Sequence, residues 1–237
     1  MSEKIIFWAA FFVAYTLNAI TGFAGNIIAM PVGMQTLGIQ ESIASLNVAG
    51  FLACGLLAIQ GFKYIDWRQL ARILAVMIVF MIVGIWLDTI VSLDILKKIF
   101  AIFVLVVGLK NLIFPQRKGV PEWLLWVALA LAGILQGMFV CGGAMLVIYA
   151  TQKLPEKDQF RATLSMNWFI LNVLYSLYSW HVGYMTADVG VVILGCIPLM
   201  IAATLVGGYI NKRMSQEAFL KFTYVMLTVI GVIMLFV

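Results

Sequence analysis

The polar residues with the clearest chemical potential interrupt the first hydrophobic segment of the chain. Between Asn18 and Pro31 the sequence reads NAITGFAGNIIAMP, with apolar sequence on both sides. Such a cluster of glycine, asparagine and proline ends a helix in a soluble protein. Inside a bilayer a helix can stop only where protein or water satisfies the freed backbone groups. The break therefore predicts a buried cavity, with a kink or a small-residue packing seam as the alternative.

A second interrupted segment follows 115 positions later. Gly22 aligns with Gly137 and Ala29 aligns with Ala144, and the second stretch reads QGMFVCGGAMLV over residues 136–147. Two interrupted hydrophobic segments in matching places of two halves are the best sequence pointer to the binding site of a transporter.

The chemistry that these breaks support is anion binding. A helix that leaves a break presents unpaired N–H groups and the positive end of its dipole, which attract an anion without any charged side chain. Glycine lets the backbone approach a ligand closely. We expect substrate-binding residues in both halves of the chain: Asn18, Thr21, Gly22, Gly25, Asn26, Asn47, Gln136, Gly137, Cys141, Gly142, Gly143, Arg161 and Asn167.

Three of these residues have an alternative role. Arg161 begins a hydrophobic segment, where it either meets the anion or reaches to the membrane surface as an anchor. Asn47 and Asn167 lie inside hydrophobic segments, where they either line the cavity or form hydrogen bonds across helices.

The composition restricts the class of protein. Of 237 residues, 64% are hydrophobic and only 11% are charged, which indicates an all-α polytopic membrane protein. The net charge of +5 lies in short loops and signals orientation, so no nucleic-acid partner is expected. The three cysteines lie in apolar segments without metal-site spacing, and the single histidine, His181, has no acid–base partner in a span. We therefore expect no catalytic residues, no metal and no cofactor; the partners are the lipid bilayer and a small anionic substrate.

The rest of the chain predicts two repeats in one integral membrane domain, over residues 1–115 and 116–237. Each repeat contains a broken segment followed by three spans. A shift of 123 positions aligns Ser92, Asp94, Lys98 and Gly108 with Ser215, Glu217, Lys221 and Gly231, and Gly84 matches Gly207. The broken segments cover residues 5–37 and 122–152, and the spans cover residues 43–60, 73–87, 99–114, 162–180, 189–210 and 218–237.

Positive charge decides how the broken segments are folded. Residues 5–37 would be about 50 Å long as one helix, too long for one crossing and too short for two. If each segment is re-entrant, only Lys4, Lys97 and Lys98 lie on one side and the other twelve Lys and Arg residues lie on the other. This bias favours the re-entrant arrangement, places both termini outside and makes the two repeats inverted. The two hairpin tips are then expected to meet near the midplane.

Several motifs resemble the TauE/SafE family of sulfite and organosulfonate exporters. GFAGNIIAMPV in the first half and GMFVCGGAMLVIY in the second are similar to its paired glycine-rich motifs, and FRATL at residues 160–164 is similar to the start of its following span. The chain departs from the family pattern at Val140, Ala144 and Met145, where the family often has glycine or proline. The resemblance implies secondary transport of a small, often sulfur-containing anion across a prokaryotic inner membrane. Together with the breaks it predicts transport of sulfite or a short organosulfonate by alternating access, with an anion channel or a membrane-embedded enzyme as alternatives.

Overall fold

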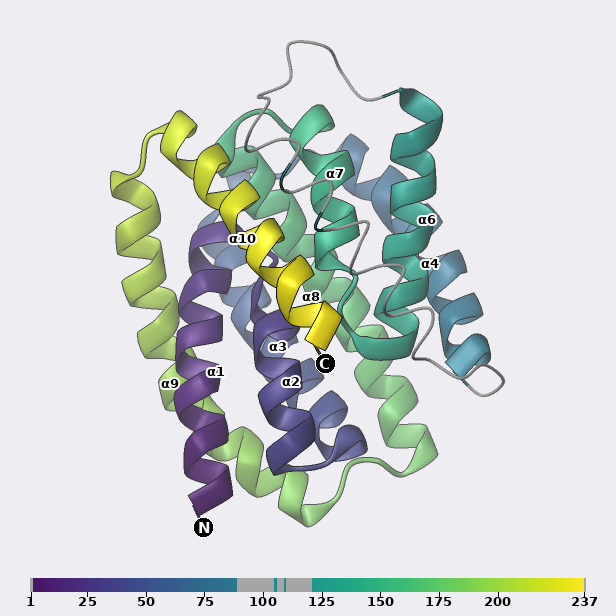
Figure 1. The fold of residues 1–237 in the computed structure, drawn as a ribbon, viewed down its shortest axis with the longest axis vertical. Helices are drawn as coiled ribbons and strands as arrows, with labels where there is room; N and C mark the ends of the chain where they lie inside the picture. Colours follow the sequence, from purple (N-terminus) through teal and green to yellow (C-terminus); the bar gives the residue numbers. More distant parts are fainter. Residues whose placement is uncertain (1, 89–104, 106–108, 110–120, 237) are drawn as a thin grey trace. The chain divides into compact units, whose positions relative to one another are not determined.

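The computed structural model describes residues 2–88, 105, 109 and 121–236, and these residues form helices and connecting turns without any strand. The predicted span over residues 99–114 lies almost wholly outside the described residues. The all-α prediction is confirmed (Figure 1). The helices are α1 (Ser2–Thr21), α2 (Gly25–Thr36), α3 (Ile39–Gln60), the 3-10 helix η1 (Phe62–Tyr64), α4 (Trp67–Asp88), α6 (Glu122–Phe139), α7 (Gly143–Lys153), α8 (Lys157–Val182), α9 (Ala187–Arg213) and α10 (Gln216–Phe236).

The chain packs as two compact units, each of which takes helices from both halves of the sequence. Unit 1 contains residues 1–71 and 158–213, and unit 2 contains residues 72–157 and 214–237. Unit 1 therefore holds α1, α2, α3, α8 and α9, whereas unit 2 holds most of α4 together with α6, α7 and α10. The inverted relation between the two repeats stays a prediction.

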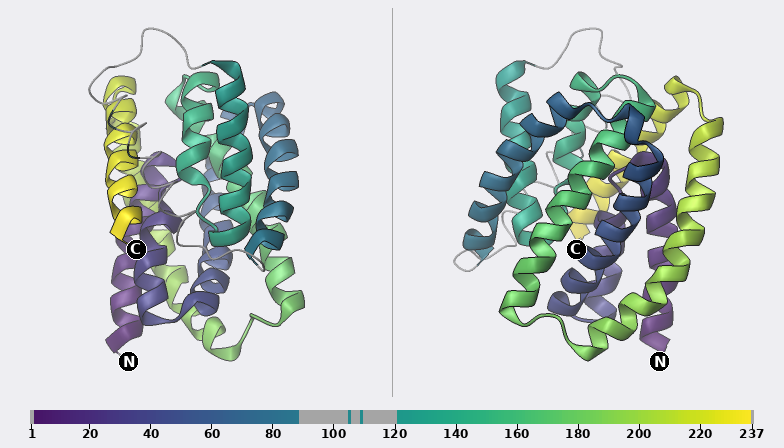
Figure 2. Two further views of the ribbon diagram at one scale, coloured as in Figure 1. Left: turned by 45° about the vertical axis from the view of Figure 1, so that its right-hand side comes forward. Right: turned by 180° about the vertical axis from the view of Figure 1, so that it is seen from behind.

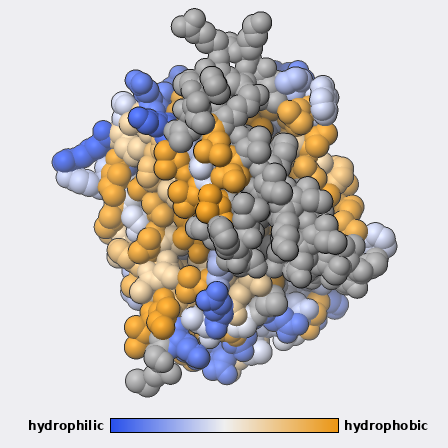
Figure 3. All heavy atoms as spheres, viewed as in Figure 1, coloured by the Kyte–Doolittle hydropathy of each residue, from blue (hydrophilic) through white to orange (hydrophobic). Residues whose placement is uncertain are grey.

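Four of the described helices are long and apolar enough to cross a membrane: α1, α3, α4 and α9. Figure 3 shows hydrophobic side chains over much of the visible face of the described helices, with hydrophilic side chains gathered toward its ends. Helix α8 is long enough to cross as well, but it does not meet the same hydropathy criterion. Its sequence carries several buried polar residues.

Both broken segments fold back as helical hairpins. In unit 1, a Cβ added at Gly33 of α2 would lie 3.2 Å from the Phe7 ring of α1, so α2 returns along α1 (Figure 2). In unit 2, Lys153 Nζ at the end of α7 lies 2.9 Å from Glu122 Oε1 at the start of α6. The folding-back required by the re-entrant prediction is therefore present in both segments.

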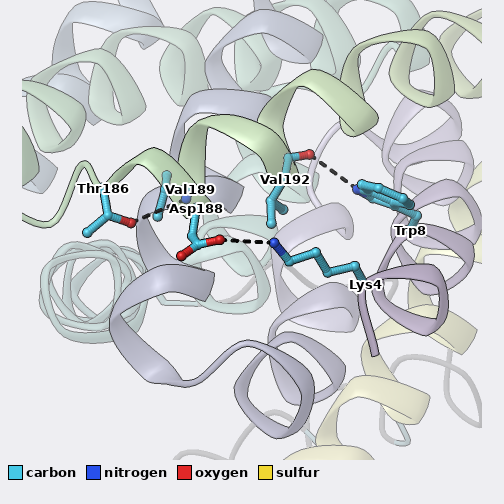
Figure 4. Close-up of polar contacts among 6 residues, drawn as sticks. All are labelled: Lys4, Trp8, Thr186, Asp188, Val189 and Val192. Carbon is cyan, nitrogen blue, oxygen red and sulfur yellow. Dashed lines mark hydrogen bonds and ion pairs between the residues drawn. The ribbon is translucent and has the colours of Figure 1, made fainter. Parts of the chain in front are cut away.

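Helix α9 packs along the whole of α1. At one end Lys4 Nζ lies 3.2 Å from Asp188 Oδ1, and Trp8 Nε1 donates to the Val192 carbonyl oxygen at 3.2 Å (Figure 4). Toward the other end, Gly207 lets α9 approach so closely that a Cβ there would collide with the Thr16 carbonyl oxygen and the Ala19 side chain. Small residues allow such close approach between membrane helices.

The same packing recurs in unit 2. A Cβ at Gly84 of α4 would collide with the Ile134 carbonyl oxygen of α6. Gly84 is the sequence counterpart of Gly207 at a shift of 123, and Ile134 is the counterpart of Ala19 at a shift of 115. Each hairpin is therefore packed by a glycine-bearing helix from the opposite half of the sequence.

Candidate anion site at the first break

The first break consists of Gly22, Phe23 and Ala24, between α1 and α2. Gly22 has φ +85°, in the left-handed region that side chains disfavour, and its N–H donates to the Asn18 carbonyl oxygen at 2.6 Å. The chain can reverse here because glycine adopts this conformation at no steric cost. The position also faces a neighbour, because a Cβ at Gly22 would lie 3.3 Å from both the Cα and the carbonyl oxygen of Arg161.

Side chains of α1 satisfy part of the exposed backbone at the break. Asn18 Oδ1 accepts the Gly25 N–H at 3.2 Å, and Asn18 Nδ2 lies 3.8 Å from Cys54 Sγ. Thr21 Oγ1 donates to the Leu17 carbonyl oxygen at 2.9 Å and accepts the Phe23 N–H at 3.4 Å. Both residues therefore cap the break, and one N–H at the start of α2 is already bonded within the protein.

Asn26, the second residue of α2, is held by an aromatic hydroxyl. Tyr15 Oη lies 2.7 Å from Asn26 Oδ1 and 3.1 Å from the Leu46 carbonyl oxygen. The Tyr15 hydroxyl thus connects α1, α2 and α3, and it fixes the Asn26 amide at the beginning of α2. Sequence reasoning missed Tyr15, because a tyrosine within an apolar run looks like ordinary core.

Arg161 brings a partly buried positive charge to this end of unit 1. Its Nε and Nη2 are buried and have no hydrogen-bond partner among the described residues. The side chain lines a cavity of about 350 Å³, together with Leu57, Gln60, Gly61, Tyr64, Asp158, Ala162, Asn211 and Lys212. This placement favours the anion-binding role over the membrane anchor, since an anchoring arginine keeps its charged end in water.

The charge of the cavity lining suits an anion. It holds two cationic side chains, Arg161 and Lys212, against one carboxylate, Asp158, within the described residues. A buried guanidinium without a partner is costly, and an oxyanion would satisfy two of its N–H groups in a bidentate contact. Sequence reasoning missed Lys212, because it looks like a routine positive residue at the end of a span.

The first break lies toward one end of unit 1, and the midplane position of the site stays a prediction. Asn211 Nδ2, near the end of α9, donates to the Ile20 carbonyl oxygen at 2.9 Å, whereas the middle of α9 falls at Met200. The reason is the length of α1, whose 20 residues extend about 30 Å, the full thickness of a hydrocarbon core. The break therefore lies toward the end of unit 1 at which α8 begins.

The second break, in unit 2, uses the same capping device. Gln136 Oε1 of α6 accepts the Gly142 N–H at 3.3 Å, as Asn18 Oδ1 accepts the Gly25 N–H in unit 1. Val140 has φ +56°, a left-handed conformation that is strained for a β-branched residue. Cys141 is buried beside it, and Gly143 begins α7.

Two glycines that we predicted as ligand-facing are used for packing. A Cβ at Gly137 would collide with the Met81 carbonyl oxygen of α4, and one at Gly142 would collide with the Ala132 carbonyl oxygen of α6. Close contact between backbones thus explains both residues without a ligand.

The two predicted asparagines outside the breaks are both buried. Asn47 Nδ2 donates to the Ile43 carbonyl oxygen of its own helix at 2.9 Å, and Asn47 Oδ1 has no partner among the described residues. Asn167 lies six residues after Arg161 on α8, which turns it about 120° away from Arg161 at 100° per residue. The binding role of Asn47 and Asn167 stays a prediction.

Comparison with known proteins identifies the chain. The family model described as "Sulfite exporter TauE/SafE" matches residues 7–234. A relative from Cupriavidus necator, named as a probable sulfite/organosulfonate exporter TauE, is 25% identical over 202 residues, which cover 80% of this chain and 77% of the relative. No solved structure matches the chain. Because the family model covers nearly the whole sequence, this multi-pass membrane transporter belongs to the TauE/SafE family and is not an enzyme.

Proposed function

We propose that the protein is a secondary transporter that carries sulfite or a short organosulfonate across the inner membrane by alternating access around its two broken helices. The Cupriavidus necator relative is named for this class of substrate. The observation that carries the proposal is the buried guanidinium of Arg161, which has unpaired nitrogens in a cavity and backbone contact with the first break.

The chemistry of the cavity fits such a substrate. Sulfite and sulfonates carry three oxygens on one sulfur, so two of the oxygens can accept the paired N–H groups of one guanidinium. The N-terminus of α2 adds about 0.3–1 kcal/mol of favourable dipole interaction, or about 2 kcal/mol when partly buried. Because Asn18 already binds the Gly25 N–H, we assign the main attraction to Arg161 and a supporting one to the helix end.

The proposed orientation places both termini outside and the Arg161 cavity on the cytoplasmic side. Within unit 1, Lys4 and Asp188 lie at one end of the α1–α9 pair, and Ile20 and Asn211 lie toward the other end. This arrangement agrees with the predicted split of positive charge. An exporter needs such a cytoplasmic entry site to collect the anion.

Counterflow in proteoliposomes tests this proposal. A carrier loaded with unlabelled taurine or sulfite should accelerate uptake of the labelled anion and should saturate, whereas a channel shows neither property. Loss of a charge-assisted hydrogen bond costs about 1.5–3 kcal/mol, so Arg161→Gln should raise the half-saturating concentration about 10- to 150-fold.

The control variants distinguish the effect of the Arg161 charge from the effect of removing any positive charge. Arg68→Gln removes an exposed arginine from the start of α4 and should leave the half-saturating concentration unchanged. Arg161→Lys should recover part of the affinity. Equal half-saturation for wild type and Arg161→Gln would contradict the assignment of Arg161, and transport of neutral or cationic solutes alone would contradict the substrate class.

A further inference from the structure

Helix α8 carries a continuous polar face through the interior of unit 1. At 100° per residue, the positions in the 80° arc that extends from 20° on one side of Arg161 to 60° on the other recur every three or four residues. From Arg161 to Ser179 every position in this arc is polar, and the same arc includes Asp158 in the first turn. The face consists of Arg161, Ser165, Trp168, Asn172, Ser176 and Ser179.

This face is buried, and most of its polar atoms lack partners. The hydroxyls of Ser165, Ser176 and Ser179 and the indole Nε1 of Trp168 are buried without a hydrogen-bond partner among the described residues, as are Nε and Nη2 of Arg161. Unpartnered buried polar atoms are rare because they destabilise the fold, so a run of them on one face requires an explanation.

Several other helix hydroxyls in this protein do have hydrogen-bond partners. Thr16, Thr21 and Thr36 each donate to the carbonyl oxygen four residues earlier, at 2.8 to 2.9 Å, which is how such residues are ordinarily satisfied in helices. The three α8 serines form no such bond within the described part of the chain. Their hydroxyls therefore stay available to water or to a ligand.

Two glycines of neighbouring helices lie against this face. A Cβ at Gly50 of α3 would lie 2.7 Å from Asn172 Nδ2, so α3 packs closely there, and one at Gly208 of α9 would lie 3.6 Å from Arg161 Nη2. Besides the 350 Å³ cavity at Arg161, Ser176 lines a second cavity of about 680 Å³ with Val48, Phe51, Val173, Leu177, Trp180 and Met185. The polar face thus connects two hollows of unit 1.

We propose that this face of α8 lines the track of the anion and its water through unit 1, which alternating access opens to one side of the membrane at a time, with Arg161 as its entry residue. From Arg161 to Ser179 the face extends about 27 Å, close to the thickness of the hydrocarbon core. Its groups are N–H and O–H donors, and it carries no carboxylate beyond Asp158 at the cavity, which suits an oxyanion and disfavours a cation. The substrate class rests on the proposed function, but the existence of the track does not.

Labelling of introduced cysteines tests the track. Ser165→Cys, Ser176→Cys and Ser179→Cys are treated in membrane vesicles with 2-sulfonatoethyl methanethiosulfonate, a thiol reagent that is itself a short organosulfonate. Ile170→Cys and Leu174→Cys, on the opposite side of α8, are the matched controls. The wild-type protein, whose three cysteines are buried, gives the background rate.

We expect the three track cysteines to react at least tenfold faster than the two controls. Excess 2-hydroxyethanesulfonate should slow this reaction, and the cationic trimethylammonium analogue of the reagent should react more slowly than the anionic one. Equal rates at the track and control positions would overturn the proposal. Equal rates for the two reagents would overturn its anion selectivity.

A second measurement avoids introduced thiols. Replacing Ser165, Ser176 and Ser179 together by alanine removes hydroxyls that have no partner among the described residues, so the thermal midpoint should stay the same or rise while the counterflow rate falls at least tenfold. An unchanged counterflow rate would refute the track. If the wild-type protein carries neither sulfite nor a sulfonate, the proposed function fails, and the labelling contrast still decides whether the track exists.

Discussion

Replacing Gly22 with alanine separates the backbone conformation of the first break from its contact with α8. A side chain in the left-handed region costs about 1–2 kcal/mol, and Gly22 has φ +85°. The new methyl group would also lie 3.3 Å from the Arg161 Cα and carbonyl oxygen, which is tight enough to displace the start of α8. Gly38 is the matched control, because it has φ +89° and no atom within 4 Å of an added Cβ.

Both variants should lose about 1–2 kcal/mol of stability, which lowers the thermal midpoint of a chain of this size by about 2–8 °C. Only Gly22→Ala should also impair transport, because only this variant moves Arg161. The assay is the thermal midpoint in detergent together with the initial rate of sulfonate counterflow in proteoliposomes. We expect counterflow at least tenfold slower in Gly22→Ala than in Gly38→Ala. Equal rates would refute the coupling between the break and Arg161.

Two further predictions concern unit 2 and the topology. Val140→Gly should lower the stability by only about 1 kcal/mol, because relief of the left-handed strain, about 1–2 kcal/mol, offsets much of the loss of a buried valine side chain, about 1.5–3 kcal/mol; a fall in stability by the full cost of the side chain would show that Val140 is not strained. A reporter that is active only in the cytoplasm should be silent when fused after Val237 and active when inserted at Pro155, and the reverse pattern would invert the proposed orientation.

The positions of the breaks could be predicted from the sequence because glycine clusters carry a direct backbone signal. The breaks at residues 22–24 and 140–142 fall within the predicted stretches, and the observed helices extend the predicted spans by only a few residues. The pairing of Gly84 with Gly207 was also visible, because the shift of 123 positions is shared by several separated residues. Each of these features can be found from the sequence pattern without knowledge of tertiary contacts.

The use of each polar group could not be predicted, because it depends on tertiary neighbours. The sequence indicates unpaired N–H groups after the break, but not that Asn18 reaches across to Gly25. It places glycine at position 137 without revealing that α4 packs there. The polar face of α8 was readable from its spacing of three and four residues, but only burial shows that these serines differ from an ordinary surface stripe.

The packing of α9 along α1 has a consequence for how the protein is made. The Asn211 side chain that binds the Ile20 carbonyl oxygen lies 191 residues later in the chain. Ribosomes add about 5–20 residues per second, so the first hairpin enters the membrane roughly 10–40 s before this partner is synthesised. During that interval the carbonyl group at the end of α1 and the small residues facing Gly207 lack their native neighbour. The first hairpin is therefore the part of the nascent chain most dependent on lipid, water or the insertion machinery until α9 arrives.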